Sequence, residues 1–199
     1  MGNINIKYSD NFTDDSLIYD LIEIEKDVYK KEYCGKYEMI LDRFHRYKDM
    51  FILAYDNDKV IGYLCFFPIS KSLEYEIIYT ENFHDDDIEP KDIVEIEKNN
   101  NIYLISIALY KRYHRKGIGK LMMSSFFDKM RIEKKVGHNI NKIIASVVTV
   151  EGETLLNKYG FKLVNDLMEK KNYKLYIKEG EEIWKILIFL FLYQYLKKE

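Results

Sequence analysis

The apolar residues of this chain recur with two periods, and each period predicts one kind of element. Residues 4–8 alternate between apolar and polar positions, as a strand with one buried face does. Residues 17–28 and 37–44 carry apolar side chains three and four positions apart, which predicts two helices joined near Gly35. The first helix has three candidate N-cap residues: Thr13, Asp14 and Asp15.

The middle of the chain is predicted to consist mainly of strands. Two apolar runs, over residues 51–55 and 60–67, are separated by polar turn residues and predict a β-hairpin. Residues 102–109 are apolar almost throughout, which is typical of a strand covered on both faces. Further predicted elements are a helix that starts at Gly117 and ends near Gly137, a strand over 143–150, a short helix that closes at Gly160, and a strand over 173–177. This order predicts a mixed α/β fold, with helices packed on a sheet.

Length and charge bound the possible functions. The 199 residues are enough to bury a core, and no repeat or linker divides them, so residues 1–199 are expected to form one domain. Hydrophobic residues make up 47% and charged residues 32%, a globular balance. The net charge of -2 argues against a general attraction to nucleic acid or anionic lipid.

Cysteine usage and the N-terminus add little chemistry. Cys34 and Cys65 are too few for a disulfide framework or a metal cluster, so no metal site is expected. Cys65 lies in an apolar run, which favours a buried small hydrophobe. Residues 1–7 lack the apolar core of a signal peptide, so we expect a cytoplasmic protein.

A polar stretch follows the predicted hairpin and contains the acidic run Asp85, Asp86 and Asp87. Adjacent carboxylates could bind a cation, but spacing alone does not show converging ligands. We expect a solvated acidic loop.

The C-terminal segment, residues 180–199, is hydrophobic. Residues 183–193 are apolar on nearly every side, yet the run is shorter than the roughly 20 residues of a membrane span, and Lys185 interrupts it. No stable membrane insertion is expected. The segment is instead expected to pack within the domain or across a homodimer, with peripheral membrane contact as the lesser alternative.

The turn after residues 102–109 carries the candidate chemistry. The first N–H groups of a helix lack partners within it, and the helix dipole adds partial positive charge, so a strand that leads through glycines into a helix suits an anion. Gly117 and Gly119 allow close approach of a phosphate. Four cations surround them: Arg112, Arg115, Lys116 and Lys120.

Other phosphate motifs fail on the same residues. A dinucleotide fingerprint needs a third glycine where Met122 stands, and a P-loop needs Ser or Thr where Leu121 stands. The remaining alternative to a phosphate site is a tight turn with solvated basic residues.

Two strings resemble the GNAT-type N-acetyltransferases. Residues 104–109 with the turn His114-Arg115-Lys116-Gly117-Ile118-Gly119 are similar to that family's acetyl-CoA motif. Residues 157–161, Asn-Lys-Tyr-Gly-Phe, resemble its closing Lys-Leu-Gly-Phe signature. The resemblance implies a single, mostly antiparallel sheet with a splayed central strand and flanking helices.

The resemblance also implies a site for acetyl-CoA. The pantetheine arm would lie in the splay on the backbone of the central strand, and the pyrophosphate would take N–H groups of the turn. The cofactor-binding residues that this implies are Ile107, Ala108, Leu109, His114, Arg115, Lys116, Gly117, Ile118, Gly119 and Lys120. The acceptor amine would enter from the opposite side and attack the thioester directly.

The sequence departs from the family pattern at three positions. His114 stands where the family has Arg or Gln, and Thr149 stands where it often has Asn. Leu156 occupies the position of a Tyr that commonly protonates the leaving thiolate in the family. Tyr159 lies about 300° further around an ideal helix, so it is not an automatic substitute.

The catalytic residues are left open by the sequence. The named candidates are Glu97, Ser106 and Tyr159. Further candidates for the base are Glu95, Tyr103, Tyr29, Tyr33, Tyr37 and His45. We expect an N-acetyltransferase acting on a small amine or on a protein amino group. The alternatives are a catalytically silent acyl-CoA sensor or partner module on the same fold, and a plain α/β domain without a coenzyme A site.

Overall fold

The computed structural model describes residues 2–81, 83–97, 99–164 and 173–183, and these contain one seven-stranded sheet in the order β1-β2-β3-β4-β5-β7-β6. The strands are β1 (Ile4–Tyr8), β2 (Phe51–Asp56), β3 (Lys59–Ile69), β4 (Asn99–Leu109), β5 (Asn139–Val147), β6 (Lys162–Leu163) and β7 (Lys174–Glu179). Every pair of neighbours is antiparallel except β4 and β5, which are parallel. The predicted mixed, mostly antiparallel sheet is confirmed.

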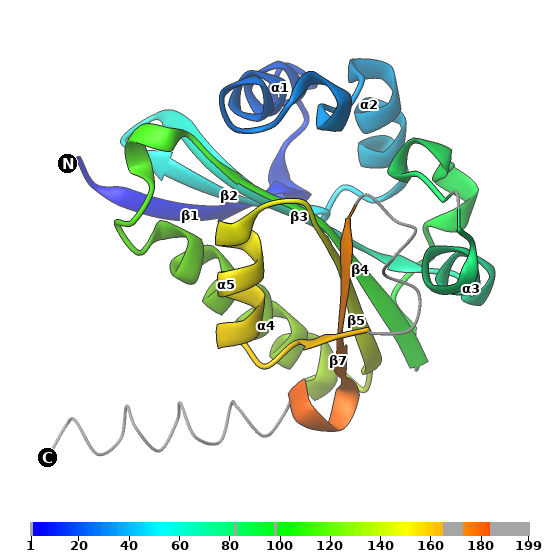
Figure 1. Ribbon diagram of the computed structural model, residues 1–199. Helices are drawn as coiled ribbons and strands as arrows, with labels where there is room; N and C mark the ends of the chain where they lie inside the picture. The colour runs from blue at the N-terminus through cyan, green and yellow to red at the C-terminus, as the bar shows by residue number, and fades with distance from the viewer. Residues whose placement is uncertain (1, 82, 98, 165–172, 184–199) are drawn as a thin grey trace, which may run out of the picture.

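Helices cover both faces of this sheet. They are α1 (Leu17–Val28), α2 (Tyr37–Arg46), α3 (Lys71–Tyr79), α4 (Ile118–Lys135) and α5 (Val150–Lys158). In Figure 1, α1 and α2 lie on one side of the strands, and α4 and α5 lie on the other. Because both faces are covered, β3 is buried at every position from Val60 to Ile69, as its apolar run requires.

The sheet divides at its centre. The register between β4 and β5 ends at Leu104 opposite Ala145, although β4 continues to Leu109. On the other edge of β4, Ser106 pairs with Cys65 and Leu104 pairs with Phe66, so Ile105 is the extra residue of a β-bulge. A bulge bends its strand, and β4 parts from β5 at this point.

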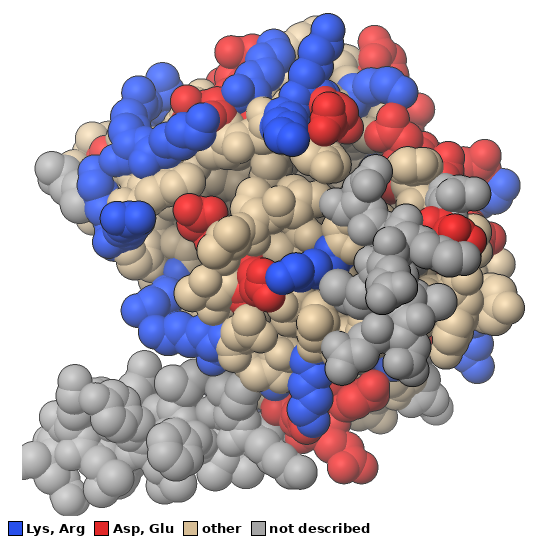
Figure 2. Space-filling model, in the orientation of Figure 1, with Lys and Arg blue, Asp and Glu red and all other residues tan. Residues whose placement is uncertain are grey.

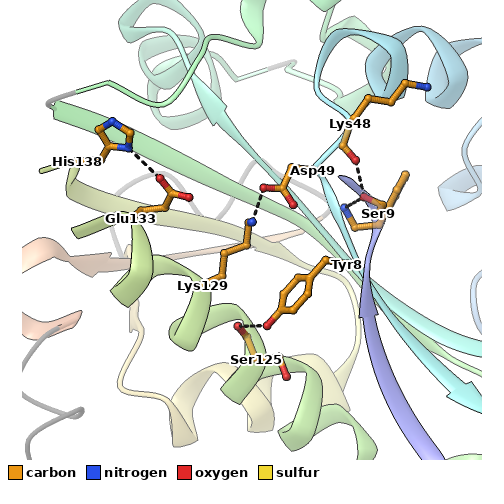
Figure 3. A network of polar contacts seen from close by, with 9 residues as sticks. Tyr8, Ser9, Lys48, Asp49, Ser125, Lys129, Glu133 and His138 are labelled. Atoms are coloured by element: carbon orange, nitrogen blue, oxygen red, sulfur yellow. Dashed lines mark hydrogen bonds and ion pairs between the residues drawn. The ribbon is translucent and has the colours of Figure 1, made fainter. Parts of the chain in front are cut away.

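Polar contacts fix α4 on the β1–β2 end of the sheet (Figure 3). Lys129 forms an ion pair with Asp49, just before β2, and both side chains are largely shielded from solvent. The hydroxyl of Tyr8, at the end of β1, donates to the backbone carbonyl of Ser125 over 3.3 Å. These contacts tie the middle of α4 to β1 and to the residues just before β2.

Some predicted boundaries are wrong. The strand predicted over 143–150 runs from Asn139 to Val147, because Thr149 is the N-cap of α5 and its hydroxyl accepts from Gly152 N at 3.1 Å. The polar stretch after the hairpin contains a helix, α3, whose N-cap Ser70 accepts from Leu73 N at 3.1 Å. The N-cap of α1 is Ser16, next to the three predicted candidates. Residues 184–193 of the predicted apolar segment lie outside the described residues.

Candidate active site

A cavity of about 680 Å³ opens where β4 and β5 part. Its central walls are residues 104–107 of β4 and residues 146–149, which run from β5 to the start of α5. From one face of the sheet it is lined by α1, by α2 and by residues 85–87, and from the other by α5. The cavity therefore reaches both faces of the sheet through the split.

The turn between β4 and α4 has the backbone conformation of an anion site. Gly117 is the N-cap of α4 with φ 82° and ψ -2°, and the helix continues from it in the right-handed conformation. Consecutive left- and right-handed residues form a concave nest of N–H groups. A Cβ built on Gly117 would meet no atom within 4 Å, so the space in front of this backbone is open. These residues fit a phosphate group.

Cations gather at the same end of the molecule. Figure 2 shows basic side chains concentrated on the side where the β4–α4 turn lies. Lys158, at the end of α5, lies close enough to Lys120 that this second ammonium lowers the pKa of Lys158. Two like charges side by side repel, and a bound anion would relieve that repulsion.

The end of β4 is held by two side chains. The ring of His114 donates through Nε2 to the Leu109 carbonyl at 2.7 Å, since a carbonyl oxygen can only accept. The hydroxyl of Tyr29, after α1, donates to the Ile107 carbonyl at 2.9 Å. Burial raises the pKa of Tyr29 to about 12, so the phenol stays protonated at neutral pH. The residues expected to carry the cofactor arm thus lie on a positioned strand.

A buried carboxylate, Glu25 of α1, lines the cavity next to β4. Its Oε1 accepts from the Tyr63 hydroxyl, and its Oε2 accepts from Gly35 N at 2.7 Å. Tyr63 in turn lies 3.2 Å from the Ser106 hydroxyl, which is also 3.2 Å from the hydroxyl of Tyr29. Burial raises the pKa of Glu25, and its two hydrogen bonds partly offset that rise.

A second carboxylate, Asp85, lines the cavity from the loop before β4. The Tyr103 hydroxyl donates to Asp85 Oδ1 at 2.6 Å and also contacts the Ser146 hydroxyl. Burial raises the pKa of Asp85 to about 6. The expectation of a solvated acidic loop is wrong for Asp85, because Tyr103 and Arg43 draw it inward, while Asp86 and Asp87 are exposed as expected.

Comparison with known proteins decides the family. The family model described as the acetyltransferase (GNAT) family matches residues 17–145, well over half of the chain. The chain belongs to the GNAT acetyltransferase family. The central strand β4 and the glycine turn at the start of α4 both lie within the matched span.

Solved structures share the GNAT fold at low sequence identity. Ard1 from Thermoplasma volcanium is 16% identical with a TM-score of 0.59, and 88% of this chain covers 97% of that one. The PaiA N-acetyltransferase from Thermoplasma acidophilum, solved with coenzyme A, is 17% identical with a TM-score of 0.57, and 89% of this chain covers 99% of it. Arabidopsis thaliana Naa50, solved with the bisubstrate analogue CoA-Ac-MVNAL, is 14% identical with a TM-score of 0.58. The match covers 88% of this chain and 98% of that one. A search of curated proteins finds no match.

The structure separates the three named catalytic candidates of this GNAT protein. Ser106 lines the cavity. Glu97 is exposed before β4 and does not line the cavity. Tyr159 stacks on Phe127, and its hydroxyl donates to the Lys120 carbonyl at 2.9 Å, away from the cavity wall.

The other candidates for the base separate in the same way. Tyr29 and Tyr33 line the cavity, and the hydroxyl of Tyr103 reaches the cavity-lining residues Asp85 and Ser146. Three more have partners elsewhere: Tyr37 stacks on Tyr19, His45 pairs with Asp15, and Glu95 pairs with Arg46. Leu156 forms part of the cavity wall, where its side chain presents an alkyl group and no hydroxyl.

Sequence reasoning missed Glu25, Asp85 and Ser146. Glu25 stands among the apolar positions of a helical face, between Ile24 and Val28, which is a usable signal of a buried carboxylate. Asp85 gives no such signal, because its burial depends on residues from α2 and β4. In the described part of the chain, no group of three or more potential metal ligands converges, and no helix is long and apolar enough to cross a membrane.

Proposed function

We propose that this protein is an acetyl-CoA-dependent N-acetyltransferase that transfers the acetyl group to a primary amine by direct attack in a ternary complex. The observation that carries the proposal is the cavity through the split sheet, lined by the carboxylates Glu25 and Asp85, together with the glycine turn at the start of α4, whose conformation suits a phosphate. Acetyl-CoA, when bound, supplies an activated thioester. The chain supplies orientation, a route into the split, and groups that accept a proton.

The cofactor half of the site follows from the turn and from β4. We expect the N–H groups from Arg115 to Lys120 to hold the pyrophosphate, with full positive charge from Lys116 and Lys120. The backbone from Ile107 to Leu109, held by Tyr29 and His114, is expected to hold the pantetheine arm. Polarisation of the thioester carbonyl near Leu109 would add electrostatic stabilisation.

The acceptor is proposed to be a small amine or a protein amino group. The acidic lining on the α1–α2 side, which includes Glu25 and Asp85, suits a cationic ammonium. Naa50, a structural neighbour, was solved with coenzyme A joined through acetyl to a peptide, so the same fold admits a peptide acceptor. We further propose that residues 1–199 act as one cytoplasmic domain. Residues 180–199 are proposed to complete the domain or a homodimer, which truncation after Glu182 and light scattering would test.

One observation favours a second function, a silent acyl-CoA sensor. Leu156 gives the cavity wall an alkyl group where catalytic relatives commonly have the acidic Tyr hydroxyl. A thiolate can also leave without a strong acid or with water as the proton donor, so this position alone does not abolish transfer. The two functions differ in turnover and not in cofactor binding.

A thiol-release assay with acetyl-CoA and a panel of small amines and peptides tests the proposal. The wild type is expected to release thiol only with an acceptor present. Gly119→Trp is expected to lose both cofactor binding and turnover. A Cβ at Gly119 meets only Leu155 Cδ2, at 3.7 Å, which is an ordinary contact, and the large indole beyond it is expected to block the turn. Tight acetyl-CoA binding without turnover on any amine would support the sensor.

A further inference from the structure

We propose that Asp85 is the proton acceptor for the substrate ammonium group, with Tyr103 holding its carboxylate and Arg43 holding its backbone at the cavity. The inference rests on the proposed N-acetyltransferase function. An amine must be uncharged to attack a carbonyl carbon, and most primary amines are ammonium ions at neutral pH. A site for them therefore needs a group that removes one proton.

Arg43 places Asp85 through the backbone. Its guanidinium is buried in α2 and donates from Nη2 to the Asp85 carbonyl at 2.5 Å. It also donates to the Ile88 carbonyl, from Nε at 3.1 Å and from Nη2 at 2.9 Å. A planar donor that spans two carbonyls fixes the loop between them. The guanidinium thus supplies positive charge near the Asp85 carboxylate while its hydrogen bonds go to the backbone.

Hydroxyl groups connect Asp85 to the split. Tyr103 donates to its Oδ1, and Ser146 lies beside the Tyr103 hydroxyl. Ser146 directly follows Ala145, the last residue of β5 that pairs with β4, so its hydroxyl stands at the point where the strands part. Because the Tyr103 hydroxyl donates its hydrogen bond to Asp85, Ser146 is the donor in the hydrogen bond between Ser146 and Tyr103. This series of hydrogen-bonded hydroxyls provides a proton path from the split to a carboxylate.

The surroundings of Asp85 suit a base that works near neutral pH. The groups that face it are Tyr103 on β4, Arg43 on α2, Tyr173 before β7, Cys65 on β3, and His84 and Asp86 on its own loop. Burial raises the pKa of Asp85 to about 6, against the lowering effects of the Tyr103 hydrogen bond and of Arg43. Such a carboxylate is ionised at neutral pH and is more basic than an exposed one.

Glu25 is the competing carboxylate, and its contacts differ. Both of its oxygens accept hydrogen bonds, one from Tyr63 and one from Gly35 N, and these tie α1 to β3 and to the loop before α2. Within the described residues, Asp85 accepts a side-chain hydrogen bond on Oδ1 from Tyr103. The geometry assigns Glu25 to holding the cavity wall and Asp85 to proton transfer.

The proton step balances without a further reagent. One proton leaves the ammonium nitrogen for a carboxylate oxygen of Asp85, directly or by shifts through Ser146 and Tyr103, and nitrogen keeps its electron pair. That pair forms the bond to the acetyl carbon as the carbon–sulfur bond breaks and sulfur leaves with its electrons. The second proton of nitrogen goes to sulfur, and Asp85 later releases its proton to water.

The test compares pH profiles of kcat/KM for the best acceptor of the amine panel. The wild-type profile is expected to rise with pH through a midpoint near the Asp85 pKa of about 6. The kcat/KM of Asp85→Asn should be roughly 100-fold or more below that of the wild type at pH 7, and its profile should lack the rising limb near pH 6. Its activity should recover only at alkaline pH, where the amine itself deprotonates. The KM for acetyl-CoA should stay within about twofold, because a proton-acceptor role leaves uniform binding unchanged.

Two matched variants make the result specific. Glu23→Gln changes an exposed carboxylate of α1 that pairs with Lys26 at 2.6 Å and does not line the cavity, and it should leave kcat/KM within about twofold. Glu25→Gln should keep the limb near pH 6. Loss of that limb in Glu25→Gln but not in Asp85→Asn would overturn the assignment and leave the proposed function standing. Absence of wild-type turnover on every amine, with acetyl-CoA still bound, would overturn both.

Discussion

The guanidinium of Arg43 donates a hydrogen bond of 2.5 Å to the backbone carbonyl of Asp85, 42 residues further along the chain. The same group holds the Ile88 carbonyl, and Arg43 is only 3% exposed. One buried cation therefore organises the loop that forms part of the cavity.

Arg43→Gln is expected to lower the free energy of unfolding by about 3 kcal/mol, because it leaves buried carbonyls without their charged donor. Denaturant unfolding measures this loss. Arg46→Gln, on the same helix, breaks an ion pair with the exposed side chain of Glu95 and should cost less than about 1 kcal/mol. Equal effects of the two variants would contradict the role given to Arg43.

Asp85 is expected to make stability depend on pH. Its pKa is about 6 in the folded protein, above its ordinary value of 3.8, so folding favours the protonated form. Stability is therefore lost as pH rises from about 4 to 6, and the loss is complete above that range. At about 1.4 kcal/mol per tenfold change in an ionisation constant, the carboxylate costs up to about 3 kcal/mol.

Asp85→Asn removes this cost, so its melting temperature should exceed that of the wild type at pH 8 and approach it at pH 4. Thermal unfolding at the two values checks the sign. A variant that is destabilised equally at both values would show that Asp85 is not held in a site that disfavours its charge.

The glycine turn can be tested with two variants at opposite ends of α4. Gly117 and Gly137 both have positive φ, at 82° and 97°, and a Cβ on either meets no atom within 4 Å. Alanine at either position should cost about 1 kcal/mol from the left-handed backbone. Only Gly117→Ala should weaken the binding of acetyl-CoA, with a Kd about tenfold higher by calorimetry, because only Gly117 lies in the turn. Equal affinities would contradict the phosphate site.

Leu156 allows a test of the missing acid. It is 2% exposed and lines the cavity. Leu156→Tyr should raise kcat severalfold if protonation of the thiolate limits turnover, while Leu156→Phe adds a similar ring without the hydroxyl and should not. Steady-state kinetics with both variants separates the hydroxyl from the change in size. A gain with Phe alone would point to shape instead.

The sequence predicts the local parts of this fold well, because their signals are local. The apolar run of β4 predicts a strand, and the glycine before α4 predicts the start of a helix. Both elements lie where the pattern places them. The helix over residues 71–79 was missed, since only Leu73, Ile77 and Ile78 are buried in it and polar residues surround them. The N-cap Ser70 is the signal that could have revealed it.

The acceptor side of the site was harder to predict, because it depends on contacts between distant segments. Asp85 stands in a run of three aspartates that reads as a solvated loop. It turns inward because Tyr103 and Arg43, 18 and 42 residues away, offer it a hydroxyl and a charged donor. Such a convergence follows from the order of the strands and not from any motif in the sequence.

The most direct test of the central claim is formation of an acetylated amine from isotope-labelled acetyl-CoA, followed by mass spectrometry across the acceptor panel. We predict a labelled product with the wild type on at least one amine, and none with Gly119→Trp. Acetyl-CoA that binds tightly to the wild type and leaves every amine unlabelled would contradict the claim that this cavity transfers acetyl groups.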